Sequence, residues 1–370
     1  PSLLAIPFFI LLGTLMSYTG IAERILHIAN VLVGKMRGGL GVANILVSTM
    51  MGGVSASNLA DAAMLSRMMV PEMERKGYNR AFAAAITAGG SLVTPIIPPG
   101  IALIIYGLVA DVSIGKMFIA GLVPGLLCAV VLMFTVYLVA RKTNAKPSRE
   151  SWPTGKEVVF SLGQAWPALF LIFAVVGGIR ANIFTPTEAG AAAVLIVLAI
   201  GFFIYREMRI SHVVKALGET ARATASVMLV IMASAALGWI FSMEHAGVAV
   251  ANFVTSLTEN KYMFLLIINI LLLTLGMFLE GNAILLILVP LLKPVVEHFG
   301  IDPVHFGIIM IFNLSIGAFT PPVGTVMLLV CNITQVSVGN FFKQSLPLLA
   351  ALLLMLMLVT YIPAISLFLV

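Results

Sequence analysis

The chain has 370 residues, of which 61% are hydrophobic and only 10% are charged, with a formal net charge of +6. Soluble domains are about half apolar and about a quarter charged, so this chain has too few charged residues to cover a water-facing surface. The composition therefore excludes soluble globular, disordered, collagenous and disulfide-stapled proteins. It predicts an all-α polytopic membrane protein surrounded by a lipid bilayer.

The reactive residue types give no sign of an enzyme. Cys128 and Cys331 lie in apolar runs, and the five histidines show no metal-binding spacing such as HExxH. No phosphate-binding lysine motif or nucleophile elbow is present in the sequence. The basic residues cluster between apolar segments, which is typical of topology signals rather than of a nucleic-acid surface. We therefore expect no enzymatic activity, no cofactor and no nucleic-acid partner.

The apolar segments predict several membrane-spanning helices, because a helix needs about 20 mostly apolar residues to cross a bilayer. The chain starts with Pro1, already inside an apolar run, so we expect further segments upstream of this sequence. The polar stretch 144–155 predicts a cytoplasmic loop. The predicted spanning segments are 3–16, 117–140, 158–178, 189–205, 223–241 and 342–370.

Other apolar segments are interrupted by polar, glycine-rich or proline-rich motifs. GGVSASN at 52–58 and GMFLEGN at 276–282 each predict the tip of a helical hairpin. TPIIPPG at 94–100 and TPPVG at 320–324 each predict a break within a helix. The order of tip, Val-Pro pair, break and VS-G motif occurs twice along the chain. Chance is the alternative explanation, but four markers in the same order favour an internal repeat.

The repeat predicts three parts. Residues 1–143 form a first repeat, with a hairpin at about 38–73 and a broken helix at about 80–110. Residues 144–221 provide the linker and scaffold helices. Residues 222–370 form a second repeat, with a hairpin at about 262–298 and a broken helix at about 305–335. Threading the copies in opposite orientations places most of the 21 Lys and Arg residues on the cytoplasmic side, which predicts inverted repeats with re-entrant hairpins.

The interruptions carry the predicted chemistry. Irregular backbone cannot face lipid, so these segments must be buried in protein or line a polar cavity. The end of one half-helix offers carbonyl groups that suit a cation such as Na⁺, and the start of the next offers N–H groups that suit an anion. Paired breaks in two inverted halves are typical of a transport site at the bilayer midplane.

Polar side chains at the tips are expected to face the breaks. They could instead only cap the hairpin helices, although capping and ion binding are compatible. The first group contains Ser55, Ser57, Asn58, Thr94, Pro95 and the carbonyls before Pro98, and the second contains Gly276, Glu280, Asn282, Gly317, Thr320 and Pro321.

Acidic and polar residues near the tips are candidates for a substrate cavity. Carboxylates within a membrane are expensive to bury and are therefore functional candidates. Asp61 and Glu280 could instead be ordinary helix-start acids. The cavity candidates are Asp61, Pro98, Glu280, Asn313 and Ser315.

Several motifs resemble the large membrane subunit of tripartite ATP-independent periplasmic (TRAP) transporters. The resemblance runs nearly end to end but lacks the family's further N-terminal segments. The motifs are IPFFILLGTLM at 6–16, GGVSASNLADAAML at 52–65, TPIIPPGIALIIYG at 94–107, FTPTEAGA at 184–191 and FTPPVGTVML at 319–328.

The resemblance implies an elevator-type secondary transporter in a bacterial cytoplasmic membrane, without enzymatic activity and with Na⁺ as coupling ion. It implies Na⁺ sites at both tips, which by position fall on Ser55, Ser57, Asn58, Thr94 and Pro95, and on Gly276, Asn282, Gly317, Thr320 and Pro321. It also implies a small four-helix membrane partner, a periplasmic substrate-binding protein and an organic acid substrate such as a C4-dicarboxylate or a sialic acid. A stand-alone Na⁺/anion symporter of related two-hairpin fold and an anion channel are the alternatives.

Overall fold

The computed structural model describes residues 2–55, 57–143, 145–181, 183–244 and 246–370. Within these ranges the chain is helices joined by turns and loops, with no β-strand. This agrees with the predicted all-α class. The first half contains η1 (Ser2–Leu4), α1 (Ala5–Met16), α2 (Ile21–Val33), α3 (Gly39–Ser55), α4 (Asn58–Arg75), α5 (Arg80–Ser91), α6 (Ile101–Val109), α7 (Ile114–Arg141) and α8 (Gly155–Arg180).

The second half continues the helical pattern, and one short segment, η2, is a π-helical turn. Its elements are α9 (Pro186–Ala199), η2 (Ile200–Ile204), α10 (Ile210–Met243), α11 (Ala246–Leu257), α12 (Lys261–Phe278), α13 (Gly281–His298), α14 (Pro303–Phe319), α15 (Thr325–Thr334), α16 (Val338–Tyr361) and α17 (Ala364–Leu367).

Seven helices in the described ranges are long and apolar enough to cross a membrane, and the bent pair α1–α2 could supply an eighth span. The seven are α7, α8, α9 with η2, α10, α12, α13 and α16. Many of their large apolar side chains are exposed, including Phe173 on α8 and Trp239 on α10. Such faces suit contact with lipid. The prediction of a polytopic membrane protein is therefore confirmed.

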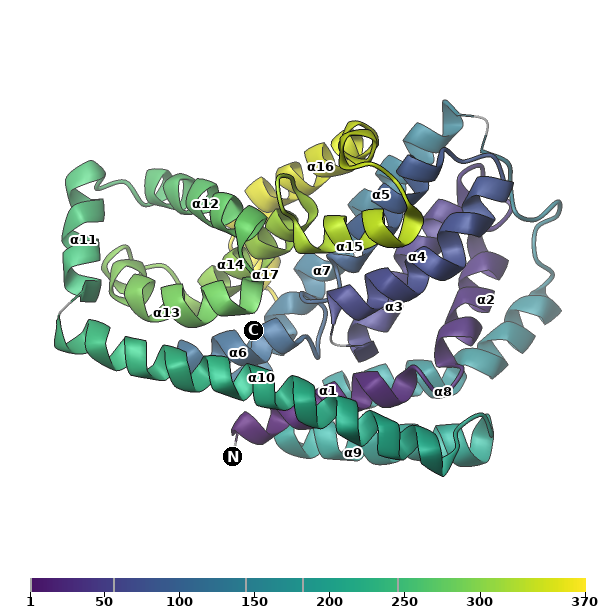
Figure 1. Ribbon diagram of the computed structural model, residues 1–370, viewed down its shortest axis with the longest axis horizontal. Helices are drawn as coiled ribbons and strands as arrows, with labels where there is room; N and C mark the ends of the chain where they lie inside the picture. Colours follow the sequence, from purple (N-terminus) through teal and green to yellow (C-terminus); the bar gives the residue numbers. More distant parts are fainter. Residues whose placement is uncertain (1, 56, 144, 182, 245) are drawn as a thin grey trace.

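Figure 1 shows α10 running along one edge of the molecule, where it packs against α1. The chain then turns through α11 at one end and returns through α12 and α13. Helices α2 to α5 gather at the opposite end of the molecule, and α14 to α17 lie between the two groups. Helix α10 packs against both α1 and α13, so it links the two ends.

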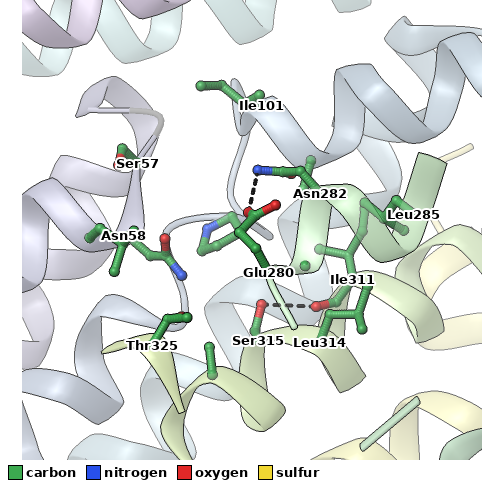
Figure 2. Close-up of a pocket in the computed structure, with 15 residues that line it drawn as sticks. Ser57, Asn58, Ile101, Glu280, Asn282, Leu285, Ile311, Leu314, Ser315 and Thr325 are labelled. Atoms are coloured by element: carbon green, nitrogen blue, oxygen red, sulfur yellow. Dashed lines mark hydrogen bonds between the residues drawn. The ribbon is translucent and has the colours of Figure 1, made fainter. Parts of the chain in front are cut away.

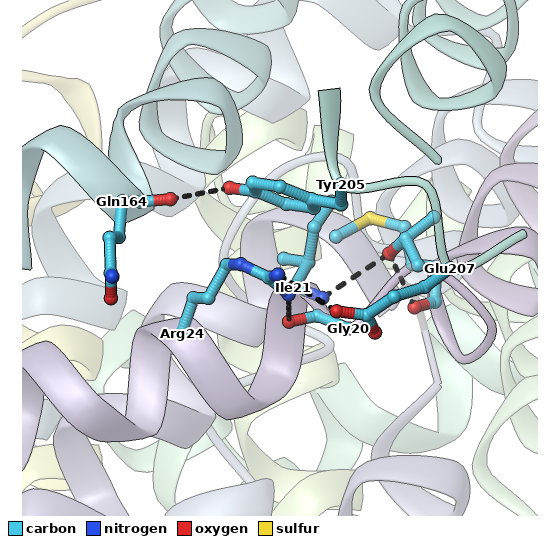
Figure 3. A network of polar contacts seen from close by, with 8 residues as sticks. Gly20, Ile21, Arg24, Gln164, Tyr205 and Glu207 are labelled. Carbon is cyan, nitrogen blue, oxygen red and sulfur yellow. Dashed lines mark hydrogen bonds and ion pairs between the residues drawn. The ribbon is translucent and has the colours of Figure 1, made fainter. Parts of the chain in front are cut away.

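A polar cluster holds the 68° bend between α1 and α2. The Arg24 guanidinium donates to the Gly20 carbonyl and to Glu207 Oε1, both at 2.8 Å. It also lies 3.8 Å from the centre of the Tyr205 ring, whose hydroxyl donates to the Gln164 carbonyl at 2.7 Å. Figure 3 shows these contacts joining the start of α2 to α8 and to the segment after α9.

Two helix pairs end at short tips. Helix α3 ends at Ser55 and α4 begins at Asn58, and α12 and α13 meet at Leu279 and Glu280. Ser57 and Glu280 are the N-caps of α4 and α13, and each side chain accepts a backbone N–H three residues later. Side-chain caps of this kind replace the hydrogen bonds that the first turn of a helix lacks.

Two breaks separate α5 from α6 and α14 from α15. Prolines explain where the helices end, because proline has no backbone N–H and is disfavoured inside a helix. Pro95, Pro98 and Pro99 lie in the first break, and Pro321 and Pro322 lie in the second. Asn79 and Asp302 cap the starts of α5 and α14 with their side chains. The two breaks therefore interrupt the apolar segments at the expected motifs.

The helices before the breaks form the core of the molecule. Every residue of α14 after Pro303 is buried, as is every residue of α5 after Arg80. Helices that are apolar on all sides are found in such positions. Helix α5 packs against α3, α4 and α16, whereas α14 packs against α12, α13 and α16. Protein therefore surrounds the helices that lead into the breaks.

Some predicted helix ends differ from the structure. Helix α10 begins at Ile210 rather than near 223, because its first turns carry charged residues that lower hydropathy without preventing a helix. The last long helix, α16, runs from Val338 to Tyr361 and not to the end of the chain. Pro363 follows its C-cap, and the short helix α17 comes after it.

Candidate functional site

The two tips, the first break and residues on either side of the second break line one pocket, which has about 130 Å³ of water-accessible space. Figure 2 shows the amide of Asn58 and the carboxylate of Glu280 pointing into this space, with Ser315 on the opposite wall. The lining residues are Ser57, Asn58, Leu59, Pro95, Ile101, Ala102, Glu280, Gly281, Asn282, Leu285, Ile311, Leu314, Ser315, Ala318 and Thr325.

Four helices begin at this pocket, namely α4, α6, α13 and α15. Side chains cap two of them, because Ser57 accepts the N–H of Ala60 and Glu280 accepts the N–H of Ala283. The N-caps of α6 and α15 are Gly100 and Gly324, and within the described residues no side chain caps either helix. The first-turn N–H groups of α6 and α15 thus remain available to an anion.

The second tip is built around the Glu280 carboxylate. Its Oε2 accepts the Ala283 N–H at 3.0 Å, and its Oε1 accepts the side-chain amide of Asn282 at 2.8 Å. No Lys, Arg or His forms an ion pair with it in the described part of the chain. Glu280 therefore caps a helix and lines the pocket, so the two sequence interpretations of this residue are both compatible with the geometry.

The second break packs tightly against the end of α12. A Cβ atom placed on Gly317 would lie 2.6 Å from Cα of Gly276, so only glycine allows this approach. The N–H of Gly324 donates to the Met277 carbonyl at 2.9 Å. Thr320 donates its hydroxyl to the Ile316 carbonyl at 2.7 Å. The contacts of Gly317 and Gly324 join the end of α12 to the second break through the backbone.

The first break has a buried carboxylate beside it. Asp61 is 1% exposed and lies in the first turn of α4. Its Oδ2 accepts the hydroxyl of the buried Thr94 at 3.4 Å. Its Oδ1 is buried without a hydrogen-bond partner in the described part of the chain. Buried polar groups are normally paired, so this carboxylate suits a cation.

Asn313 belongs to a different polar chain and does not line the pocket. Its amide donates to Asn269 Oδ1 at 2.7 Å, and the Asn269 amide donates to the Thr360 hydroxyl at 3.0 Å. His305 continues this chain through the Thr360 carbonyl at 3.3 Å and Ser366 Oγ at 2.9 Å. These residues connect α12, α14, α16 and α17 within the protein.

The structure thus divides the sequence candidates into two groups. Six of them line the pocket, namely Ser57, Asn58, Pro95, Glu280, Asn282 and Ser315. The rest lie behind its wall or farther away: Asp61, Thr94, Pro98, Gly276, Gly317, Thr320, Pro321 and Asn313. The side chain of Ser55 lies outside the described part of the chain.

Sequence reasoning missed the apolar half of the lining and Thr325. Ile101, Leu285 and Leu314 resemble ordinary membrane residues, and no pattern separates them from lipid-facing side chains. Thr325 is the first residue of α15, so its position directly after TPPVG could have identified it. In the described ranges no group of three His, Cys, Asp or Glu residues could hold a metal ion. The oxygens of the pocket would suit an alkali cation instead.

Taken together, the helices and the pocket define a polytopic membrane protein with a central polar site built from helix ends. Comparisons with known proteins give the family. The sequence model of the "Tripartite ATP-independent periplasmic transporter, DctM component" family matches residues 1–365. The chain therefore belongs to this family, as its motifs predicted, and is a large permease component of the bacterial inner membrane.

Similar proteins support this assignment. The chain is 40% identical to the C4-dicarboxylate TRAP transporter large permease protein DctM of Pseudomonas aeruginosa, over 99% of this chain and 85% of that protein. It is also 40% identical to the sialic acid TRAP transporter large permease protein SiaM of Vibrio cholerae, over 100% of this chain and 86% of that protein. The isethionate TRAP transporter permease protein DctMQ of Oleidesulfovibrio alaskensis is 37% identical, over 99% of this chain and 58% of that protein.

A solved structure is similar in fold. The YdaH transporter of Alcanivorax borkumensis superposes with a TM-score of 0.59 at 15% identity, covering 95% of this chain and 86% of that chain.

Proposed function

We propose that the chain imports an organic acid anion across the bacterial inner membrane, coupled to the entry of Na⁺. The observation that carries the proposal is the pair of helix starts, at α6 and α15, that no described side chain caps and that open onto the same pocket. Their N–H groups and helix dipoles favour a carboxylate. Relatives named for C4-dicarboxylate and sialic acid transport support the same substrate class.

The Na⁺ sites of this proposal lie beside the anion, at the helix ends behind the pocket wall. At the first site, Thr94 and Asp61 offer oxygens, with Ser57, Asn58 and Pro95 at the edge. At the second, Gly276 and Gly317 bring two chain segments into backbone contact, and the proposed ligands there also include Asn282, Thr320 and Pro321. A cation next to an anion lowers the electrostatic cost of burying either charge, which is the physical basis of coupling.

The membrane arrangement is part of the same proposal. The two tips enter the bilayer from opposite sides as re-entrant hairpins, in inverted repeats covering 1–143 and 222–370. The hairpins and broken helices move as an elevator against the scaffold helices. The corresponding order of elements in the two halves, α3 to α7 and α12 to α16, supports this arrangement.

Two partners complete the transporter. A small four-helix membrane subunit would pack against the exposed scaffold, and a periplasmic binding protein would deliver the substrate. This chain covers 58% of the relative named DctMQ. The uncovered part of that protein could contain such a subunit in the same polypeptide.

The test is uptake of labelled succinate or sialic acid by proteoliposomes that contain the chain and its small subunit, with the cognate binding protein outside. An inward Na⁺ gradient should drive accumulation, and a proton gradient alone should not. Accumulation that follows only the proton gradient would overturn the coupling. Uptake that needs no binding protein would instead indicate a stand-alone symporter, and downhill flux without saturation would indicate a channel.

Two substitutions locate the ion sites. Ser57→Ala removes a hydroxyl at the first tip, and Thr320→Ala removes one at the second break. Both should raise the Na⁺ concentration needed for half-maximal uptake while the protein remains folded. Ser226→Ala on the exposed face of α10 also removes a hydroxyl that donates within its own helix, and it serves as the matched control. An unchanged Na⁺ titration in Ser57→Ala and Thr320→Ala would remove these residues from the sites.

A further inference from the structure

Two hydrogen bonds connect the broken helices of the two halves in a reciprocal way. Near the end of α6, the Tyr106 hydroxyl donates to the carbonyl of Pro303, the first residue of α14, at 2.6 Å. At the start of α5, Arg80 donates its Nε–H to the carbonyl of Thr334, the last residue of α15, at 2.8 Å. Each bond thus joins the start of one broken helix to the end of the other.

The Tyr106 contact is buried and closely fitted. Tyr106 is 2% exposed. Its ring lies against Gly307, where an added Cβ would be 2.4 Å from ring atom Cε1. The ring therefore occupies the place of a side chain at Gly307, one turn after Pro303, and its hydroxyl reaches the carbonyl of Pro303. A buried hydroxyl without a partner is unfavourable, so this bond fixes the ring along α14.

The Arg80 contact lies nearer the surface. The side chain is 46% exposed and also pairs with Glu74 Oε2 on α4 at 3.3 Å. The carbonyl of Thr334 is at the C-terminal end of α15, where helix carbonyls lack partners and a cation is favoured. Arg80 therefore holds the end of α15 beside both α5 and α4.

The helices of the two halves also pack against each other. Helix α6 packs against α13 of the second hairpin, and α15 packs against α4 of the first. The opposite ends of α6 and α15 are the helix starts at the pocket, which no side chain caps in the described ranges. Helix α6 has nine residues, about 13 Å at 1.5 Å per residue, so a shift at its far end is transmitted to the pocket.

We propose that Tyr106 and Arg80 are positioning residues that set where the free N–H groups of α6 and α15 stand in the pocket. Each residue donates a hydrogen bond to the other half of the molecule. The two anion-binding helix starts therefore keep a fixed position relative to each other. This inference rests on the proposed function. Loss of either bond lets a half-helix slide, which weakens binding of the anion while the transport step itself is retained.

The first test compares Tyr106→Phe with a matched control. Tyr361→Phe also removes a hydroxyl that donates to a carbonyl, that of Tyr262 at 3.2 Å, but both residues belong to the second half. Uptake of labelled succinate or sialic acid, whichever the wild type takes up, is measured against substrate concentration. Tyr106→Phe should raise KM about fivefold, equivalent to ~1 kcal/mol for one neutral hydrogen bond, with kcat within about twofold. Tyr361→Phe should keep the wild-type KM.

Arg80→Lys provides the second variant, because lysine keeps the charge beside Glu74 but lacks the Nε–H. Its KM should rise about twofold, since an exposed contact contributes less than a buried one. Arg75→Lys is its control, because Arg75 pairs only with Glu72 on its own helix among the described residues. If Tyr106→Phe does not fold, Arg80→Lys still decides the outcome.

Hydrogen exchange gives a readout that needs no substrate. In Tyr106→Phe, exchange should rise in peptides covering 101–109 and 303–307 together, and stay as in the wild type over 338–361. A role in stability alone would lower the melting temperature without moving KM or this pattern. Wild-type KM and exchange in both variants would overturn the inference. Absence of Na⁺-driven uptake in the wild type would instead contradict the proposed function, while the exchange result would still report on the two contacts.

Discussion

Gly317→Ala tests whether the close contact between the second tip and the second break builds an ion site. An added Cβ would lie 2.6 Å from the carbonyl carbon and from Cα of Gly276. Backbone atoms cannot rotate away as a side chain can, so α12 must move from α14. Overpacking usually costs ~1–3 kcal/mol, and a backbone collision belongs at the upper end. If the cost falls on the ion-bound state, ~3 kcal/mol corresponds to about a 100-fold loss of Na⁺ affinity.

The assay is the Na⁺ dependence of uptake in proteoliposomes, together with the melting temperature of the purified protein with and without Na⁺. Gly218→Ala is the matched control, because in the described part of the chain no heavy atom outside the adjacent backbone of α10 lies within 4 Å of its added Cβ. That change should stabilise α10 by up to ~1 kcal/mol through helix propensity and leave the Na⁺ titration unchanged. A Gly317→Ala protein with wild-type Na⁺ dependence would refute the reasoning.

Three further changes have distinct expected outcomes. Asp61→Asn keeps the size of the buried side chain but removes its charge, so the Na⁺ half-saturation should rise at least ~10-fold; an unchanged titration would exclude this carboxylate from ion binding. Asn269→Leu removes the acceptor of Asn313. The change should lower the free energy of unfolding, measured by denaturation, by ~1–3 kcal/mol and have little effect on KM. A large rise in KM would contradict the separation of Asn269 from the pocket. Glu207→Gln breaks the partly exposed ion pair with Arg24. The loss should lower the free energy of unfolding by no more than ~1 kcal/mol in thermal unfolding, and the effect should weaken in high salt. A protein that fails to fold would show that the bend between α1 and α2 depends on this pair.

The sequence predicts the helical membrane class because composition alone excludes a water-facing surface. It also locates the four interruptions, because proline and glycine act on the backbone locally and need no tertiary partner. TPIIPPG and TPPVG fall in the breaks after Ser91 and Phe319 for this reason. Hydropathy is less informative at helix ends, as the charged first turns of α10 show.

The direction of each side chain depends on the neighbouring helix and is not encoded locally. Asn313 and Ser315 are two residues apart on α14, yet Asn313 faces Asn269 and Ser315 lines the pocket. Asp61 and Glu280 are both acidic residues near a tip, yet Asp61 is buried next to Thr94 whereas Glu280 caps α13 at the pocket. The sequence also does not reveal that, within the described residues, no side chain caps α6 or α15. Gly100 and Gly324 are compatible with either a capped helix start or an open anion site.

The central claim is that both halves form one ion-binding pocket, and thiol protection tests it most directly. Ala102→Cys on α6 and Ala318→Cys on α14 each place a small side chain in the pocket lining, one from each half. Ala181→Cys, at the exposed residue directly after α8, is the control. Na⁺ alone, compared with K⁺, should slow the reaction of both pocket cysteines with a membrane-permeant thiol reagent and leave the control unchanged. Protection of only one pocket cysteine, or of neither, would contradict the account.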